Sequence, residues 1–228
     1  MSMGKRRQRT LGQAQRGFTL IELMIATMVF SLVLLIVTFG ILQITRVYFK
    51  GVTETNTQSV ARGIMDTVSQ AIQFGGGNVM VTVPGAATPS SPLAFCIGNE
   101  RFTYALGYQL SDNPASGQHQ TYHAMASDVK TGCHQHSTQP LNAPAIVGRE
   151  LLSPNMRLAN FKVESLGDSL YRVTVRIVYG DDDLLYSPAT PGDPNGDLAP
   201  DASCRGNQDG TQFCAVSELS TVVVKRVQ

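Results

Sequence analysis

The sequence predicts an α+β fold in which one long N-terminal helix packs on an antiparallel β-sheet head. Three observations carry this prediction: an uncharged apolar run, an amphipathic continuation of that run, and alternating apolar residues in much of the remainder. The chain has 228 residues, of which 43% are hydrophobic. It is therefore long enough for a substantial core and too apolar for a disordered protein.

The apolar run begins at Phe18 and ends near Ile44, and Glu22 is its only charged residue. It exceeds the roughly 20 residues that span the hydrocarbon core of a bilayer at about 1.5 Å per residue. It is also too long for a secretory signal core, and no small-x-small cleavage site follows it. We therefore expect residues 18–44 to form a transmembrane half of the helix, with an ordinary membrane anchor as the simplest interpretation.

Positive charge is concentrated ahead of this run. Residues 1–17 hold five basic residues and no acidic one, whereas the remaining chain holds thirteen basic and all 17 acidic residues. The positive-inside rule places such an N-terminus in the cytoplasm, with a single pass through the membrane. The mildly acidic body argues against nucleic acid as a partner, because a nucleic-acid-binding domain concentrates positive charge on a folded face.

The helix is expected to continue beyond the membrane. Residues 45–75 keep apolar positions near i, i+4 spacing with charges between them, and Gly75-Gly76-Gly77 ends the pattern. Thr53–Thr57 is a weak stretch that could bend. This amphipathic half should lie on the head, since a sheet and a helix must each bury one apolar face.

Residues 76–228 are predicted to form a β-rich head outside the cytoplasm. The strongest feature is a hairpin of residues 161–164 and 170–179 that turns at Gly167-Asp168. Weaker strands are expected at residues 78–83, 101–110 and 219–227. Long loops rich in Pro, Gly, Ser and Asn separate them.

All four cysteines lie beyond the membrane segment, namely Cys96, Cys133, Cys204 and Cys214. An even number of cysteines in an exported head indicates disulfides. Three pairings are open, and proximity in sequence favours Cys96–Cys133 and Cys204–Cys214. Free thiols are the alternative. The sequence has no CxxC motif, so neither redox chemistry nor a zinc ribbon is indicated.

One loop has the oxygen spacing of a calcium loop. Side-chain oxygens occupy its positions 1, 3, 5 and 9, at Asp193, Asn195, Asp197 and Asp201. The turn glycine is replaced by Leu198, and Cys204 stands where a bidentate Glu would complete the site. A solvated loop has the same composition, so calcium is one of two interpretations, and no other cofactor is expected.

The sequence contains no catalytic constellation. Four histidines, His119, His123, His134 and His136, cluster around Cys133, but their spacing matches no standard zinc site. Solvated loop histidines are the simpler interpretation. No phosphate loop, nucleophile elbow or paired acid and base appears, and we expect the protein not to be an enzyme.

The string Arg16-Gly-Phe-Thr-Leu-Ile-Glu-Leu23 combines a basic leader, a glycine, a phenylalanine, and a glutamate five residues after the glycine. It resembles the class III signal peptide of type IV pilins and type II secretion pseudopilins. The resemblance is tight over residues 16–45, and beyond them it extends only to the architecture of the pilin fold.

This resemblance implies a processing and assembly pathway. A prepilin peptidase would cut between Gly17 and Phe18, remove residues 1–17 as a leader, and methylate the new amino group of Phe18. Glu22 would pair with the N-terminal ammonium of a neighbouring subunit, which offsets the cost of several kcal/mol of a lone carboxylate in lipid. Partners would be the peptidase, other minor and major pilins, and the inner-membrane assembly platform.

The family's major subunits commonly have a proline where this chain has Phe39, and that difference favours a minor subunit. The size and loop-rich head resemble PilW-type minor pilins, which act in initiation or at the tip of a type IV pilus. A J-class minor pseudopilin of type II secretion is the near alternative. A pilus-mounted adhesin that binds a surface or DNA is the alternative of another class. The subunit would leave the inner membrane for an extracellular pilus or a periplasmic pseudopilus.

Overall fold

The computed structural model of the chain describes residues 17–82, 91–110, 120, 121, 123–129, 141, 148–186, 202–206 and 210–227. It divides into two compact units, Met1–Thr45 and Arg46–Gln228. The first unit contains the beginning of the only α-helix of the described residues, α1 (Leu20–Phe74). The second contains the end of α1 and the β-rich head.

Within the second unit α1 has one buried face. Its buried apolar residues recur at the spacing of a helix side, namely Ala61, Ile64, Met65, Val68, Ala71 and Ile72. The helix continues through Thr53–Thr57, the stretch expected to be weak. There the hydroxyl of Thr57 donates to the Thr53 carbonyl at 2.8 Å, and both side chains are buried.

The first sheet of the head has five strands in the order β1-β2-β3-β6-β7, all antiparallel. Its members are β1 (Val79–Met80), β2 (Leu93–Ile97), β3 (Glu100–Tyr104), β6 (Met125–Val129) and β7 (Arg149–Glu150). β2 and β3 form its centre and are almost entirely buried. Because β2 is buried on both faces, its sequence is a continuous apolar run without alternation, and the periodicity of a half-buried strand did not predict it.

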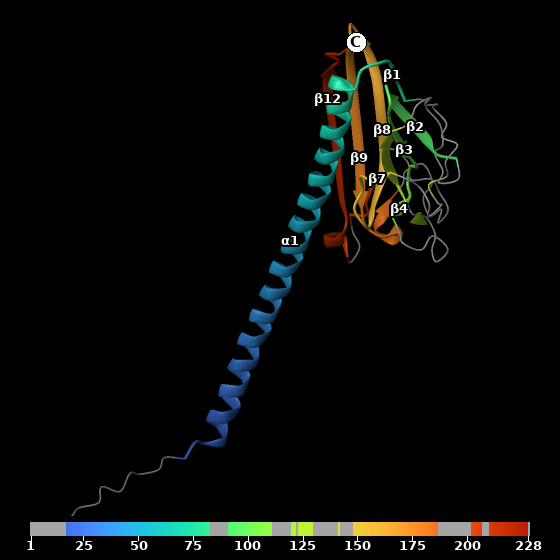
Figure 1. The fold of residues 1–228 in the computed structure, drawn as a ribbon. Coiled ribbons are helices and arrows are strands. Elements are labelled where there is room, and N and C mark those ends of the chain that lie inside the picture. Colours follow the sequence, from blue (N-terminus) through green and yellow to red (C-terminus); the bar gives the residue numbers. More distant parts are fainter. Residues whose placement is uncertain are drawn as a thin grey trace, which may run out of the picture. The chain divides into compact units, whose positions relative to one another are not determined.

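The second sheet also has five strands, in the order β12-β9-β8-β4-β5. Its members are β12 (Ala215–Val224), β9 (Leu170–Tyr179), β8 (Met156–Gly167), β4 (Gln109–Leu110) and β5 (Gln120–Thr121). The β8–β9 hairpin is the predicted one, with a longer first arm, and β12, β9 and β8 lie side by side in Figure 1. β4 and β5 pair in parallel, whereas every other pair of described strands is antiparallel.

Three predicted strands differ from the structure. The segment 101–110 is not one strand, because the chain leaves the first sheet after Tyr104 and reaches the second sheet at β4. Gly107, at φ 82°, makes this turn and donates its N–H to the Leu158 carbonyl at 2.9 Å. The segment 78–83 is reduced to β1, and the last strand begins at Ala215, four residues before the predicted start.

One apolar core joins α1 to both sheets. Phe161 of β8 lies at its centre, with ring centroids 5.7 Å from Phe95 and 5.0 Å from Tyr104. From α1 the core takes Ile64 and Val68, and both are almost fully buried. Burial of such side chains contributes about 1.5–3 kcal/mol each. The head is thus held together by residues of its own chain.

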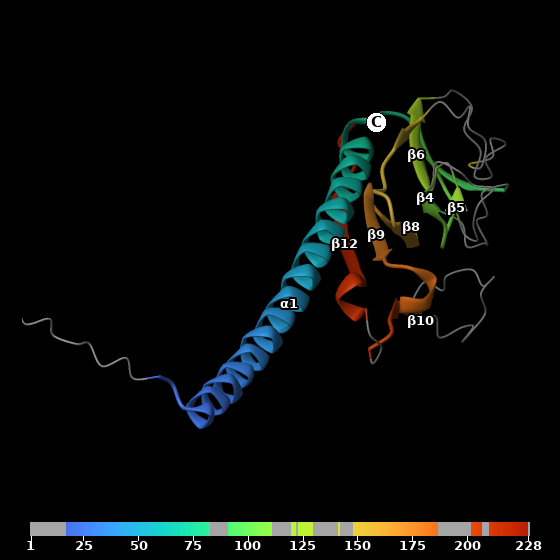
Figure 2. The same ribbon diagram turned by 90° about the horizontal axis from the view of Figure 1, so that it is seen from below.

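A glycine corner ends α1 and leads into the first sheet. Gly98 has φ 52°, and a Cβ there would lie 2.5 Å from the carbonyl oxygens of Gly75 and Gly76. Only glycine permits this approach of two backbones. The segment after β12 closes the same end of the helix, because Arg226 donates its N–H to the Gln73 carbonyl at 3.1 Å. Figures 1 and 2 both place β12 beside this part of α1.

Candidate functional site

The beginning of α1 is built as a capping box. Thr19, the residue before the helix, donates its backbone N–H to Glu22 Oε2 at 2.9 Å and its hydroxyl to the same oxygen at 2.8 Å. The backbone N–H of Glu22 donates back to Thr19 Oγ1 at 3.3 Å. This reciprocal Thr-x-x-Glu arrangement satisfies two of the free N–H groups at a helix start. The sequence Thr-Leu-Ile-Glu carries the signal of this box, which was not among the predicted features.

The capping box fixes the orientation of Glu22 while leaving it accessible. Both Thr19 and Glu22 are exposed, and among the described residues no basic side chain pairs with the carboxylate. An anionic group at a helix N-terminus is also favoured by the helix dipole. The site can therefore accept a cation from outside this chain.

Gly17 and Phe18 lie just ahead of this box. Phe18 is 91% exposed, and apart from the adjoining residues of the chain no described atom lies within 4 Å of the position that a Cβ would take on Gly17. The fold of the chain itself therefore does not require glycine at residue 17. A requirement for glycine would have to come from a protein that binds this segment.

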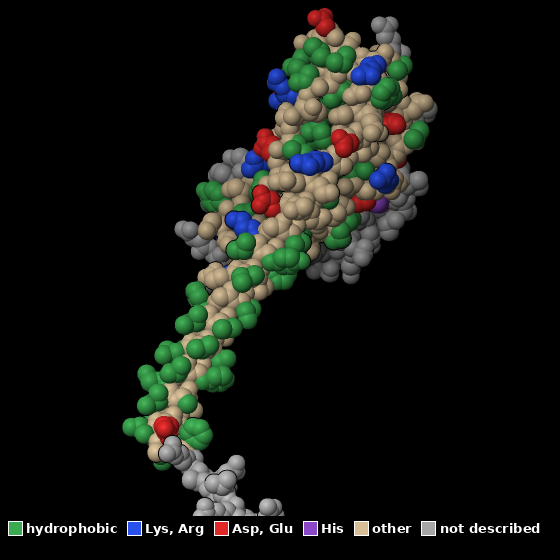
Figure 3. Space-filling view, turned by 90° about the vertical axis from the view of Figure 1, so that its left-hand side faces the viewer, with side chains coloured by type: hydrophobic (Ala, Val, Ile, Leu, Met, Phe, Trp, Pro, Cys, Tyr) green, Lys and Arg blue, Asp and Glu red, His purple; other side chains and the backbone are tan. Residues whose placement is uncertain are grey.

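The helix that follows presents apolar side chains on all sides. In the first unit every residue from Leu20 to Phe39 is exposed, and α1 is the one described helix long and apolar enough to cross a membrane. Figure 3 shows hydrophobic side chains over the visible face of this part of α1. A soluble surface of this kind would be costly, so a bilayer or other chains must cover it.

The head contains the predicted disulfide between Cys204 and Cys214, whose Cα atoms are 5.8 Å apart. It joins β11 (Ser203–Cys204) to the residue before β12. β11 pairs with β10 (Leu185–Tyr186), so the bond ties this small two-stranded sheet to the second sheet. Cys96 in β2 is also disulfide-bonded, whereas its predicted partner Cys133 lies outside the described residues.

Most of the residues considered as metal ligands lie outside the described part of the chain. Asp193, Asn195, Asp197 and Asp201 of the calcium hypothesis lie outside the described residues, as do His119, His134 and His136. Among the residues that are described, no group of three or more His, Cys, Asp or Glu side chains could hold a metal ion.

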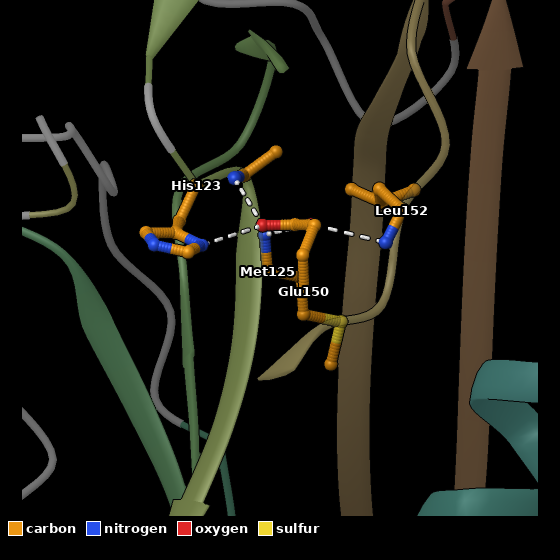
Figure 4. Close-up of polar contacts among 5 residues, drawn as sticks. His123, Met125, Glu150 and Leu152 are labelled. Atoms are coloured by element: carbon orange, nitrogen blue, oxygen red, sulfur yellow. Dashed lines mark hydrogen bonds and ion pairs between the residues drawn. The ribbon is translucent and has the colours of Figure 1, made fainter. Parts of the chain in front are cut away.

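His123 takes part in a polar cluster that the sequence did not indicate. Glu150 of β7 accepts the backbone N–H groups of Leu152 at 2.9 Å and of Ala124 and Met125 at 3.2 Å. Its Oε2 also lies 3.1 Å from Nδ1 of His123. Figure 4 shows these groups converging on one carboxylate. Glu150 thus joins β6 to the segment that follows β7.

The electrostatics of this cluster follow from its burial. The side chains of Glu150 and His123 are only 16% and 17% exposed. Burial raises the pKa of the Glu150 carboxyl, and the N–H groups of Leu152 and Met125 and the His123 ring oppose that rise. The hydrogen bonds that Glu150 accepts hold the beginning of β6 against the segment after β7.

Comparison with known proteins identifies a motif in the N-terminal segment. Residues 12–38 match the prokaryotic N-terminal methylation motif. No curated protein and no solved structure shows a significant match to the chain. The motif covers the capping box, Gly17 and Phe18. The chain therefore carries a class III signal peptide, and this signal, the apolar helix and the antiparallel sheets are consistent with a type IV pilin-like protein.

The motif also narrows the functional class. It indicates the precursor of a type IV pilin or pseudopilin, which is processed by a prepilin peptidase and assembled with other pilins. This class points to a structural subunit, and the apolar helix supports anchoring in a membrane.

Proposed function

We propose that the chain is a prepilin that is processed to a minor subunit and takes part in the initiation or tip complex of a type IV pilus. The observation that carries this proposal is the accessible Glu22 at the start of an uncovered apolar helix, within the matched motif. A neighbouring subunit's N-terminal ammonium is the cation that this carboxylate would meet.

In this proposal cleavage after Gly17 removes residues 1–17 and turns the backbone N–H of Phe18 into an ammonium, which is then methylated. Thr19 keeps its backbone N–H, so the capping box is retained in the mature subunit. The box holds Glu22 in one orientation before assembly, which lowers the entropy lost when a second chain docks.

The test is mass spectrometry of sheared, purified filaments from the strain that carries the chain. We expect a mature N-terminus at Phe18 with one added methyl group. Gly17→Val should leave the chain uncleaved, with the head still folded, because no described atom contacts that position. Gly40→Val is the control, since the space around Gly40 is equally open and it lies outside the cleavage site. An intact leader in filaments that assemble normally would contradict the proposal.

A substitution at Glu22 distinguishes processing of the chain from its assembly into filaments. Glu22→Gln keeps the size of the side chain and one hydrogen-bond acceptor but removes the charge. We expect this variant to be cleaved and to be largely missing from filaments. Normal incorporation of Glu22→Gln would show that the charge is not needed.

A minor pseudopilin of type II secretion would have the same signal and the same helix. The two systems are distinguished by deleting the gene: loss of surface pili supports the proposal, and loss of a secreted protein with pili intact supports the pseudopilin. The mass-spectrometric result at Phe18 is expected in either system.

A further inference from the structure

Three aromatic side chains gather near the beginning of the second unit. The rings of Tyr48 and Phe49, at adjacent positions of α1, lie 5.9 Å apart between centroids. The Phe49 ring also lies 5.6 Å from the ring of Phe213, which comes from the far end of the chain. All three stay accessible, with exposed fractions of 66%, 42% and 44%. We call these three residues, together with Arg46 and Lys50, the collar.

The fold holds Phe213 in place. Phe213 ends the 3-10 turn η2 (Thr211–Phe213), and its N–H donates to the Gly210 carbonyl at 2.8 Å. The next residue, Cys214, is bonded to Cys204, so the disulfide ties this turn to β11. A ring that is fixed before it meets a surface loses little entropy on binding. The head therefore presents Phe213 beside α1 in a defined position.

The apolar surface of the collar extends along α1. Val47 and Val52 are 72% and 49% exposed, and they line a shallow groove of this helix with Tyr48. A contiguous group of large exposed apolar side chains marks a place where a membrane or another molecule binds.

Basic side chains accompany the aromatic ones. Arg46 and Lys50 lie one helical turn apart on α1, and both are exposed. Arg205 and Lys50 line one hollow of about 450 Å³, which Glu54 also lines. As far as these segments of α1 and of the disulfide loop are described, Glu54 is their one acidic residue against three basic ones. This surplus of positive charge suits the phosphate groups of phospholipids.

The collar follows directly on the apolar run of α1. The run ends near Ile44, and the helix continues through Phe49 without a break. At about 1.5 Å per residue, Phe49 lies about 8 Å beyond Ile44 along the helix, whatever the arrangement of the two units. The headgroup layer on each side of the hydrocarbon core is about 5–8 Å thick. Because aromatic and basic residues are typical of this layer, a bilayer is the occupant that the collar fits best.

We propose that the collar binds the surface of the phospholipid bilayer in which the chain is anchored. The three rings enter the boundary between headgroups and acyl chains, and Arg46 and Lys50 contact phosphate groups. Phe213 is the essential member, because it brings the head, and not only the helix, to the membrane surface. This contact needs only an anchored chain, so it holds for a pilin and a pseudopilin alike and does not depend on the role proposed above.

The chain contains no tryptophan, so one substitution supplies a single fluorescent probe of this contact. The probe is Phe213→Trp in the full-length chain, reconstituted in nanodiscs of phosphatidylethanolamine and phosphatidylglycerol. We expect lipids brominated near the headgroup end of their acyl chains to lower its emission by about half or more, because an interfacial ring contacts that part of the lipid. If Phe213→Trp does not fold, broadening of the wild-type Phe213 ring signals by a spin-labelled lipid measures the same contact.

Two further tryptophans are the controls. Tyr48→Trp follows the apolar run directly, so its quenching reports only that the helix is anchored. Phe74→Trp replaces another exposed ring, about 38 Å farther along α1 than Phe49, and should keep its emission.

The combinations of results decide the proposal. Quenching of Tyr48→Trp without quenching of Phe213→Trp would overturn it, while anchoring and the pilin function would stand. Equal quenching of Phe74→Trp would overturn it too, since the lipid contact would not be confined to the collar. If neither Tyr48→Trp nor Phe213→Trp is quenched, the proposal fails with its premise of an anchored helix. A blue shift of Phe213→Trp that needs two chains in one nanodisc and ignores bromine would assign the collar to a second copy instead.

The basic residues are tested with the same probe. Lys50→Glu in the Phe213→Trp chain should reduce the quenching, because the reversed charge is repelled by phosphate groups. Arg62→Glu is the matched control, since Arg62 is also an exposed basic residue of α1 but lies twelve residues beyond Lys50. Equal quenching in the two variants would contradict the phosphate contact that we propose for Lys50.

Discussion

Two isoleucines of the same helix show how differently its two halves are used. Ile36 is 72% exposed in the first unit, whereas Ile64 is 1% exposed in the second. Backbone conformation and side chain are the same, so the difference lies in which atoms cover them. Ile64 is covered by strands of its own chain, whereas Ile36 depends on lipid or on other subunits. The first half is therefore built for an environment that the chain does not supply, and the second half belongs to a self-contained domain.

The sharpest test of this comparison replaces each isoleucine with alanine. Ile64→Ala should lower the free energy of unfolding of the head by about 2–5 kcal/mol, because it opens a cavity in the core. Ile36→Ala should change it by less than about 0.5 kcal/mol. Chemical denaturation of the full chain in detergent, followed by head-specific fluorescence of a label, measures both. A comparable loss in Ile36→Ala would mean that the two halves are not independent.

The disulfide is the next largest contribution that belongs to the head alone. Replacing both Cys204 and Cys214 with alanine should cost about 2–3 kcal/mol, the value expected for a loop closed over ten residues. Anchoring in the membrane should be unaffected, because the bond lies wholly in the second unit. Thermal melting and membrane fractionation of the double variant measure the two effects. An unchanged melting temperature would contradict this account.

Glu150 tests whether the polar cluster adds a pH dependence to the head. A carboxyl with a raised pKa stabilises the fold most at pH values below its unfolded pKa, and this contribution is lost as the pH rises through the folded pKa. The wild type should therefore lose stability relative to Glu150→Gln as the pH rises above the ordinary carboxyl value of 4.5. Denaturation of both chains across this range measures the trend.

Glu164→Gln is the control for this trend. Hydrogen bonding to Lys162 lowers the pKa of the exposed Glu164 carboxyl, so the wild type should gain stability relative to Glu164→Gln as the pH rises. Parallel trends in the two variants would show that the burial of Glu150 is not the cause.

Calcium should give the smallest effect. If Asp193, Asn195, Asp197 and Asp201 bind the ion, calcium at a concentration equal to its Kd should stabilise the head by about 0.4 kcal/mol. Thermal melting with and without millimolar calcium measures this shift, and Asp193→Ala should abolish it while Asp181→Ala should not. An unchanged melting temperature of the wild-type chain in calcium would contradict the calcium hypothesis.

Local periodicity was sufficient to predict some elements, and long-range contacts decided the others. The apolar run, the end of α1 at the glycine corner and the β8–β9 hairpin depend on residues close together in sequence. The break at Gly107 depends on where Leu158 and Ala124 lie after folding, so the alternation through Phe102 and Tyr104 did not reveal it.

The same division applies to the candidate site. Gly17, Phe18 and Glu22 could be singled out because their motif is contiguous, and the Thr19 cap was available from the same string. Glu150 could not be predicted, since two of its three backbone donors, Ala124 and Met125, lie more than 20 residues earlier in the sequence. An isolated glutamate in a short strand carries no pattern that distinguishes it from a solvated one.

The backbone bond between Arg226 and Gln73 has a consequence for the order of folding. β12 completes the core with Val223, and Arg226, two residues after this strand, closes the end of a helix that lies far earlier in the sequence. Contacts between such distant parts of a chain form slowly. The end of α1 therefore receives this cap only after the intervening strands of the head have been made, and until then its last carbonyl groups must be satisfied by water.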